Sequence, residues 1–262
     1  MPSARCRAVA RDVPSVMRGT SHATALNLSA LILACCLPVT AQITAPSEKP
    51  QVTFRTLSVD QGVSGLFYDD HGKQIALSAG DLGFSSPYPC PASGLVALYR
   101  EVPPVPPEEK PRRVPVTEFR LTGAGPHLVF FSSTRNPSDP AQPRINALVV
   151  DDSWTVHPTE TVRIFNFCKT PAGVKFANHV LEIAPTQSET RPYPGGQQAW
   201  LKAAVPAEGK WQVRISGPQA IVPNTRSTWV LLDLPPTADQ PDRYRILVRN
   251  LIDFSPAPVA KP

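Results

Sequence analysis

Few residues of this chain have the types and spacing that catalysis or metal binding requires. Its five histidines are His22, His71, His127, His157 and His179. None belongs to a His-Glu-x-x-His motif or stands near another histidine or a cysteine, so a transition-metal site has no local signature. The chain also lacks a Gly-x-Ser-x-Gly elbow, a phosphate-binding loop and a dinucleotide-binding glycine pattern. We therefore expect no enzyme and name no catalytic, cofactor or metal residue, although a triad assembled across loops stays open because triads are defined in space.

The acidic residues of the first half are loosely clustered. They are Asp60, Asp69, Asp70 and Asp81. Neighbouring loops could bring them to a calcium ion, but they lack the Asp-x-Asp-x-Asp-Gly order of a helical calcium loop. We expect solvated turn residues instead, because aspartate is common in turns. Asp151-Asp152 is expected to form a turn and linker between the halves.

Two cysteines, Cys90 and Cys168, remain once the N-terminal segment with Cys6, Cys35 and Cys36 is set aside. One lies in each half, and an even pair in an oxidising compartment is compatible with a single disulfide. Two isolated thiols are the alternative, because sequence alone cannot place the two Cα atoms within bridging distance.

Three aromatic residues could form a contact surface. Tyr88 and Tyr193 stand in Pro-Tyr-Pro segments at equivalent places in the two halves. Trp200 has the same parity as Lys202 along its predicted strand, which favours the solvent-facing side. Flat aromatic surfaces on β-sandwiches bind sugars or peptides, so these three rings are candidate contacts. The alternative is that each tyrosine closes the open end of its own β-sandwich.

The first 41 residues have the pattern of an export signal. Residues 28–37 (LSALILACCL) form a short apolar run between a basic stretch and Val39-Thr40-Ala41. A run this short, followed by small residues, predicts cleavage before Gln42, and no later apolar run is long enough to cross a bilayer. Lipid anchoring at Cys35 would need a small residue where the bulky Leu33 stands, so we expect plain cleavage.

The net charge of the chain, +5 from 26 basic and 21 acidic residues, comes largely from this leader. Residues 1–41 contain four arginines and one aspartate, which leaves 22 basic and 20 acidic residues and a net charge of +2. That balance gives no reason to expect nucleic acid or an anionic membrane as a partner. A start at Met17 in place of Met1 would give a leader of more ordinary length.

The sequence contains an internal repeat. Residues 127–152 align without a gap on residues 228–253, and residues 54–68 align on residues 162–176, where SGLFY matches AGVKF. Both pairs keep the same order, which indicates a duplicated unit. We expect a first module over 42–153, a second over 154–254 and a tail over 255–262.

The 32 prolines are scattered through the chain, which makes long helices improbable. Short alternating runs predict strands at 52–57, 65–68, 74–77, 95–99, 116–121, 128–131 and 145–150, and again at 162–167, 173–176, 180–183, 199–205, 211–215, 229–232 and 244–248. Seven short strands per half predict an all-β protein of two antiparallel β-sandwiches.

Individual strands carry further information. Residues 128–131 and 229–232 are apolar on both faces, so each predicts a central strand or one covered by the other module. Trp211, Val213 and Ile215 alternate and are expected on one face, with Trp211 and Trp229 in the core. Residues 102–115 (VPPVPPEEKPRRVP) predict a long exposed loop, which could bind a partner as an extended proline-rich segment or be a solvated insertion.

The first half resembles a secreted bacterial module of unknown function with an immunoglobulin-like sandwich. The segments that carry the resemblance are Gly65–Tyr68 (GLFY), Ala92–Leu98 (ASGLVAL) and Ile145–Val149 (INALV). It covers about 100 residues, and the insertion at 102–115 departs from it. The resemblance implies two immunoglobulin-like sandwiches in tandem and an exported location.

A second resemblance concerns Leu98–Pro104 (LYREVPP), which looks like the Arg-Glu-[Ile/Val]-Pro-Pro segment of periplasmic pilus chaperones. Those chaperones also have two sandwiches, and they complete a subunit's sheet by adding a strand. This alternative requires an exposed edge strand near residues 95–99.

Taken together, the sequence predicts an exported protein of the cell envelope, periplasmic or extracellular, that binds a partner or is structural. Its partner is expected to be a protein or glycan of the envelope. A strand-adding chaperone and a carbohydrate-binding module are the two alternatives.

Overall fold

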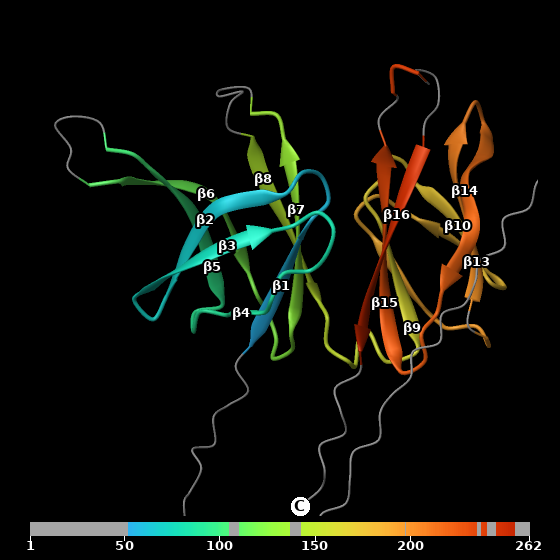
Figure 1. Cartoon of the computed structure of the whole chain (residues 1–262), viewed down its shortest axis with the longest axis horizontal. Helices are drawn as coiled ribbons and strands as arrows, with labels where there is room; N and C mark the ends of the chain where they lie inside the picture. Colours follow the sequence, from blue (N-terminus) through green and yellow to red (C-terminus); the bar gives the residue numbers. More distant parts are fainter. Residues whose placement is uncertain are drawn as a thin grey trace, which may run out of the picture. The chain divides into compact units, whose positions relative to one another are not determined.

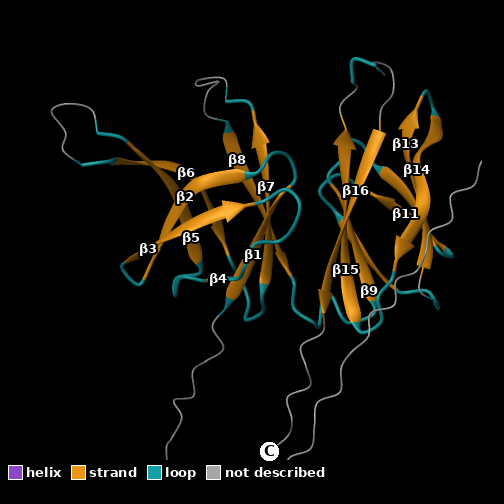
Figure 2. Cartoon of the chain, in the orientation of Figure 1, coloured by secondary structure: helices purple, strands orange, loops and turns teal. Residues whose placement is uncertain are grey.

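The computed structural model describes residues 52–104, 110–136, 143–196, 198–234, 237–239 and 245–254. These residues belong to one compact unit, Glu48–Pro262. They form strands and no helix, which confirms the all-β prediction (Figure 2). The predicted leader and the tail at 255–262 lie outside the described residues.

The first half forms two four-stranded sheets (Figure 1). One sheet has the order β4-β1-β7-β8, and the other has the order β3-β2-β5-β6. The strands are β1 (Thr53–Ser58), β2 (Val63–Asp70), β3 (Lys73–Ala79), β4 (Tyr88–Pro89), β5 (Leu95–Val102), β6 (Arg112–Arg120), β7 (His127–Thr134) and β8 (Arg144–Asp151).

The second half repeats this arrangement with the orders β12-β9-β15-β16 and β11-β10-β13-β14. Its strands are β9 (Thr161–Asn166), β10 (Ala172–Phe176), β11 (His179–Ile183), β12 (Ser188–Pro192), β13 (Gln198–Ala207), β14 (Lys210–Ala220), β15 (Thr225–Leu234) and β16 (Arg245–Phe254).

Every strand expected from the alternation is present, but two strands and two pairings were not predicted. β4 and β12 are edge strands that contain proline and polar residues, so they carry no apolar alternation. The purely antiparallel prediction is wrong at two places, because β1 pairs with β7 and β9 pairs with β15 in parallel.

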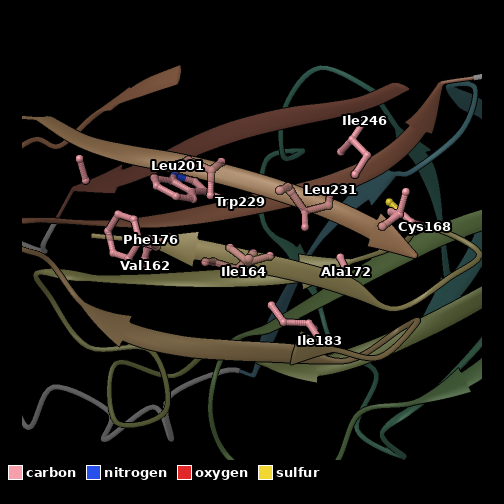
Figure 3. Close-up of a cluster of buried hydrophobic side chains, with 14 of the residues drawn as sticks. Val162, Ile164, Cys168, Ala172, Phe176, Ile183, Leu201, Trp229, Leu231 and Ile246 are labelled. Carbon is pink, nitrogen blue, oxygen red and sulfur yellow. The ribbon is translucent and has the colours of Figure 1, made fainter. Parts of the chain in front are cut away.

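Three hydrophobic cores lie between the sheets. The first half encloses a core that includes Phe54, Leu66 and Phe131, and the second encloses one built around Trp229 (Figure 3). A third core joins the halves and consists of Leu57, Val59, Leu128, Phe130, Phe165, Val230 and Leu232. The expectation that residues 128–131 and 229–232 are covered on both sides is therefore confirmed.

The strand pairing shows that the gapless alignment of the two halves is wrong by one residue in β7 and β15. Phe54 of β1 pairs with His127, whereas its counterpart Val162 of β9 pairs with Ser227 and not with Thr228. The reason is that nine residues separate β7 from β8 but ten separate β15 from β16. Since a one-residue slip in a strand exchanges its two faces, only the corrected offset places Val129 and Trp229 in equivalent cores.

The proline-rich segment is shorter as a loop than predicted. Val102 pairs with Arg112 and Tyr99 pairs with Pro115, so β6 begins inside the range assigned to the loop. β6 is an edge strand of its sheet, where a proline costs no ladder hydrogen bond. In the second half the equivalent hairpin is closed by the two-residue turn Glu208-Gly209.

Candidate functional site: the outer face of the second sandwich

Exposed apolar side chains gather on one sheet of the second half. The large hydrophobic residues exposed in the described part of the chain are Leu82, Val156, Val180, Trp200, Trp211, Val213 and Phe254. Four of them, Val180, Trp200, Trp211 and Val213, belong to the sheet β11-β10-β13-β14. We call the solvent-facing side of this sheet the second outer face. A concentration of this kind on a folded surface marks a binding site more often than scattered apolar residues do.

The position of Trp211 corrects the prediction that it belongs to the core. Ala203 pairs with Ile215 while Ala204 pairs with Val213, so β14 carries an extra residue, Arg214, in a β-bulge. The bulge interrupts the alternation. Ile215 packs against the core, but Trp211 and Val213 face solvent with exposed fractions of 49% and 58%.

A signal for this arrangement exists in the sequence. Ala199, Leu201, Ala203 and Val205 form the inward series of β13. The two-residue turn at Glu208-Gly209 then places Trp211 opposite Pro206, outside that series. Combining the turn length with the alternation would have predicted an exposed indole.

Gly173 of β10 lets the Trp211 ring lie against the sheet. A Cβ atom at this glycine would stand 3.1 Å from both Cε3 and Cζ3 of Trp211, which is closer than carbon atoms normally approach. Any larger residue would lift the indole. The ring is thus held flat over β10 by the absence of a side chain beneath it.

Trp200 supplies a second exposed ring, and its predicted solvent-facing position is confirmed. Its Nε1–H donates a hydrogen bond of 2.9 Å to Oγ of Ser216 on the neighbouring strand, which fixes the ring's orientation. Trp200 precedes Ala204, the pairing partner of Gly173, by four residues. The Cα atom of Trp200 therefore lies about 14 Å along the strand from the level of Gly173, where the Trp211 ring lies, and the Trp200 ring points toward Ser216, the partner of Lys202.

Two lysines lie between the tryptophans. Lys175 of β10 and Lys202 of β13 are direct cross-strand partners, and both are exposed. Within the described part of the chain neither makes an ion pair or a side-chain hydrogen bond; Glu182, on β11, makes none either. Like charges placed directly opposite each other destabilise a sheet, so this pair contributes nothing to folding.

Trp211 and the two lysines border a groove of about 470 Å³, whose lining does not include Trp200. It is lined by Gly173, Val174, Lys175, Val180, Leu181, Glu182, Lys202, Ala204, Trp211 and Val213. Its volume falls within the range of small-ligand sites, as does its composition of apolar walls with a few charged groups.

The equivalent face of the first sandwich is closed by its own side chains. Phe67 is the repeat counterpart of Lys175, and it stacks on its cross-strand partner Tyr99 with ring centroids 6.1 Å apart. Arg113 covers the Tyr99 ring at 4.4 Å and donates to Asp69 at 2.8 Å. The Tyr99 hydroxyl donates to the other Asp69 oxygen at 2.9 Å. We call this the first outer face.

The predicted aromatic contact surface is not assembled as a unit. Tyr88 packs against the first core, and its hydroxyl donates to the carbonyl of Ser78 at 3.3 Å. Tyr193 packs against the second core, with its hydroxyl 2.7 Å from that of Ser227. Each tyrosine thus closes its own sandwich, and only Trp200 of the three faces solvent.

The two candidate disulfide cysteines are free and are not brought together. Cys90 packs against the first core, and Cys168 belongs to the second. Burial raises the pKa of both thiols above the usual range. Since the thiolate is the reactive form, both side chains are chemically quiet.

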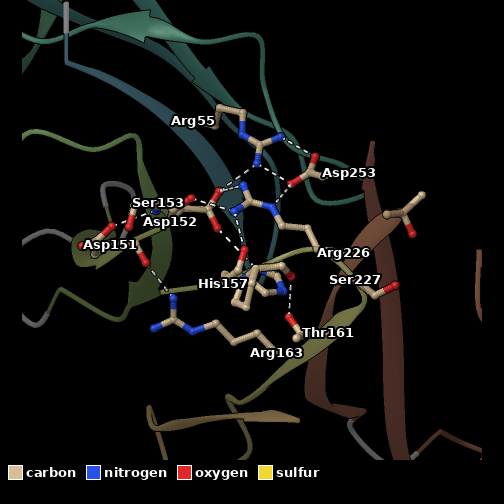
Figure 4. A network of polar contacts seen from close by, with 12 residues as sticks. Arg55, Asp151, Asp152, Ser153, His157, Thr161, Arg163, Arg226, Ser227 and Asp253 are labelled. Atoms are coloured by element: carbon tan, nitrogen blue, oxygen red, sulfur yellow. Dashed lines mark hydrogen bonds and ion pairs between the residues drawn. The ribbon is translucent and has the colours of Figure 1, made fainter. Parts of the chain in front are cut away.

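Asp152 was expected in a linker, but it is the centre of a buried ion-pair cluster between the halves (Figure 4). Its carboxylate accepts hydrogen bonds from Arg226 at 2.7 Å and from Arg55 at 3.0 Å. Arg55 also donates to both oxygens of Asp253, at 2.7 and 2.6 Å. Such a cluster fixes how the two sandwiches pack, because losing one partner would leave a buried charge unpaired.

This cluster offers no reactive group. Burial alone would raise the pKa of Asp253, but the hydrogen bonds and charge of Arg55 outweigh it and hold that pKa below its usual range. His157 is fully buried with Nδ1 3.4 Å from Asp152, and Arg226 stacks on Trp154 at 3.9 Å. Each charge is therefore held in a structural contact.

The remaining candidates are structural as well. His127 is buried, with Nε2 2.7 Å from the carbonyl of Thr122. His71 and Gly72 form the turn between β2 and β3, in which His71 adopts a positive φ of 48°; Asp70, expected as a solvated turn residue, is instead buried at the end of β2. Among the described residues, no three His, Cys, Asp or Glu side chains are placed to hold a metal ion.

The strand that a pilus-type chaperone would use is not available. β5, which contains residues 95–99, lies between β2 and β6 in the middle of its sheet. β6 pairs with β5 from Leu95 to Val102 and β2 pairs with it at Tyr99, so residues 95–99 are not the exposed edge strand that this alternative requires.

Comparison with models of known protein families and with curated proteins finds no match to this chain. The part of the chain that is described contains no helix with the length and apolarity needed to cross a membrane. The second outer face is therefore the strongest candidate for a binding site in the described part of the chain.

Proposed function

We propose that this chain is an exported, non-enzymatic protein of the cell envelope that binds a glycan on the second outer face. The observation that carries the proposal is the pair of exposed indoles, Trp200 and Trp211, each held in place by a neighbour. The face of an indole carries partial negative charge and attracts the C–H groups of a sugar ring. Two such platforms on one face of a sheet suit an oligosaccharide better than a single sugar.

The groove favours binding over hydrolysis. Enzymes that hydrolyse glycosides use two carboxylates on either side of the scissile bond. The residues lining this groove include one carboxylate, Glu182. We therefore assign the groove to recognition, with no chemical step.

The exported location rests on the N-terminal pattern, in which residues 28–37 and Val39-Thr40-Ala41 precede Gln42. N-terminal sequencing of the protein recovered outside the cytoplasm tests it. We expect the recovered chain to begin at Gln42. A chain that keeps its first residues and stays in the cytoplasm would contradict export.

A glycan array tests the binding function. The full chain should be expressed with its leader, so that the cell processes it, and then compared with a Trp200→Ala/Trp211→Ala variant. We expect the wild type to retain oligosaccharides and the variant to lose at least tenfold in affinity, because each ring contributes an aromatic contact. Leu82→Ala is the matched control, since Leu82 is 83% exposed but lies outside the face.

Two outcomes would contradict the proposal. One is retention of no glycan by the wild type while a protein co-purifies in near-equal amount, which would assign the face to a protein partner. The other is release of shortened sugars from a retained glycan, which would assign the groove to an enzyme.

A further inference from the structure

The lysine pair of the second outer face calls for a partner that the described chain does not supply. Lys175 and Lys202 oppose each other across β10 and β13, and Glu182 pairs with Gly173, one step further along the strands. No ion pair connects Glu182 to either lysine within the described residues. Two ammonium groups therefore face the groove with their charge unbalanced.

The repeat shows that this position can be filled in a more stable way. The counterpart pair in the first sandwich is Phe67 with Tyr99, a stacked aromatic pair. Aromatic pairs stabilise facing strands, whereas like charges placed directly opposite each other destabilise them. The second sandwich thus gives up stability at a position where its own fold offers an alternative, and such local conflicts are typical of binding sites.

We propose that Lys175 and Lys202 together bind an anionic group, a carboxylate or a phosphate, so that the ligand of this face is an acidic oligosaccharide. The inference rests on the proposed glycan-binding function and specifies its ligand class. Lys202 lies midway between Trp200 and Ala204 on β13. Sugar rings stacked on Trp200 and Trp211 would therefore place an acid group of the intervening unit over the lysines.

The charge balance supports an anion over a neutral ligand. The groove is lined by two lysines and one glutamate, and its other walls are apolar. An acid group between the lysines would form charge-assisted hydrogen bonds in a site partly shielded from water by the indole. It would also relieve the repulsion between the two ammonium groups.

Matched acidic and neutral probes test this inference. The probes are tetragalacturonate with its methyl ester, and a phosphorylated mannose tetramer with its unphosphorylated parent. Affinities should be measured by calorimetry at low and high salt for the wild type, a Lys175→Met/Lys202→Met variant and Trp211→Ala. Methionine keeps much of the length of the lysine stem and removes the charge, so folding should be unaffected.

We expect the wild type to bind at least one acidic probe about tenfold or more tightly than its neutral parent. High salt should reduce this preference. The methionine variant should bind the acidic and neutral members of each pair equally, and Trp211→Ala should weaken both. Preference for the uronate or for the phosphate identifies the type of acid group.

Failure of the inference is distinguishable from failure of the function. If neutral and acidic probes bind equally to the wild type and both depend on Trp211, the face binds glycans but the lysines do not select an acid. If an acid preference survives in the methionine variant, another site binds the anion. If no oligosaccharide binds and Trp211→Ala changes nothing, the proposed function itself is wrong.

Discussion

The two outer faces are built on the same strand arrangement but differ in the residues at one cross-strand position and in how those residues are paired. On the first face, Phe67 and Tyr99 stack and Arg113 covers them, with its charge neutralised by Asp69. On the second face, the same cross-strand position holds Lys175 and Lys202. The first arrangement satisfies its own side chains, and the second leaves both lysines without a charged partner among the described residues. After duplication, one copy can retain stability while the other acquires a binding surface.

Placing lysines at the equivalent positions of the first face should cause the largest change in the free energy of unfolding. The Phe67→Lys/Tyr99→Lys variant loses an aromatic pair, buries a charge at Tyr99, which is 8% exposed, and removes the platform beneath Arg113. We expect a loss of about 3 kcal/mol in the free energy of unfolding, measured by urea denaturation. A change below about 1 kcal/mol would show that the first face does not depend on its aromatic pair.

Glycine gives a second contrast between the faces. Gly65 and Gly173 occupy the same repeat position, but Gly65 has a φ of +68° beside a register shift in β2. Nothing lies within 4 Å of a Cβ at Gly65, whereas Trp211 lies 3.1 Å from a Cβ at Gly173. The backbone requires glycine at the first position, and the indole requires it at the second.

Alanine at each glycine separates these two requirements. Gly65→Ala should lower the free energy of unfolding by about 1–2 kcal/mol, because it forces a left-handed backbone on a residue with a side chain. Gly173→Ala should cost less but should displace the Trp211 ring, weaken glycan binding several-fold and shift tryptophan fluorescence. The comparison fails if Gly173→Ala leaves both binding and fluorescence unchanged.

Much of the scaffold could be predicted from the sequence, because burial repeats every second residue in a strand. The alternation at 199–205 predicts a half-buried strand, and the apolar runs at 128–131 and 229–232 predict coverage on two sides. The parallel pairs could not be predicted this way, since alternation gives the faces of a strand but not the direction of its neighbour.

The candidate site was harder to predict because two of its features depend on register. Trp211 is exposed because the turn at Glu208-Gly209 places it opposite Pro206, and Ile215 returns to the core through a bulge at Arg214 that no residue type in that run signals. Lys175 and Lys202 are separated in sequence and meet only because β10 pairs with β13. The exposure of Trp200, by contrast, follows from the alternation of its strand alone and can be predicted from the sequence. The ion-pair cluster of Asp152 cannot be recognised from the sequence, because its two arginine partners come from distant strands.

Placing the aromatic residues of the first face on the second should change the free energy of unfolding by an intermediate amount. In the Lys175→Phe/Lys202→Tyr variant, like charges are replaced by an aromatic pair. We expect a gain of about 1 kcal/mol in the free energy of unfolding, together with loss of the preference for acidic probes. A less stable variant would indicate that the lysines are stabilised by contacts within the fold.

Removing one charge from each face should have the smallest effects, with opposite signs. Arg113→Gln removes a half-exposed ion pair and a contact with the Tyr99 ring, so it should lower stability by less than about 1 kcal/mol. Lys202→Gln removes a like-charge contact with Lys175, so stability should stay level or rise slightly. High salt should shrink both differences, because ions screen exposed charges. Urea titrations of both variants at low and high salt measure this. If both substitutions lower stability at low salt, the lysine pair cannot be the strained arrangement from which an acidic ligand is inferred.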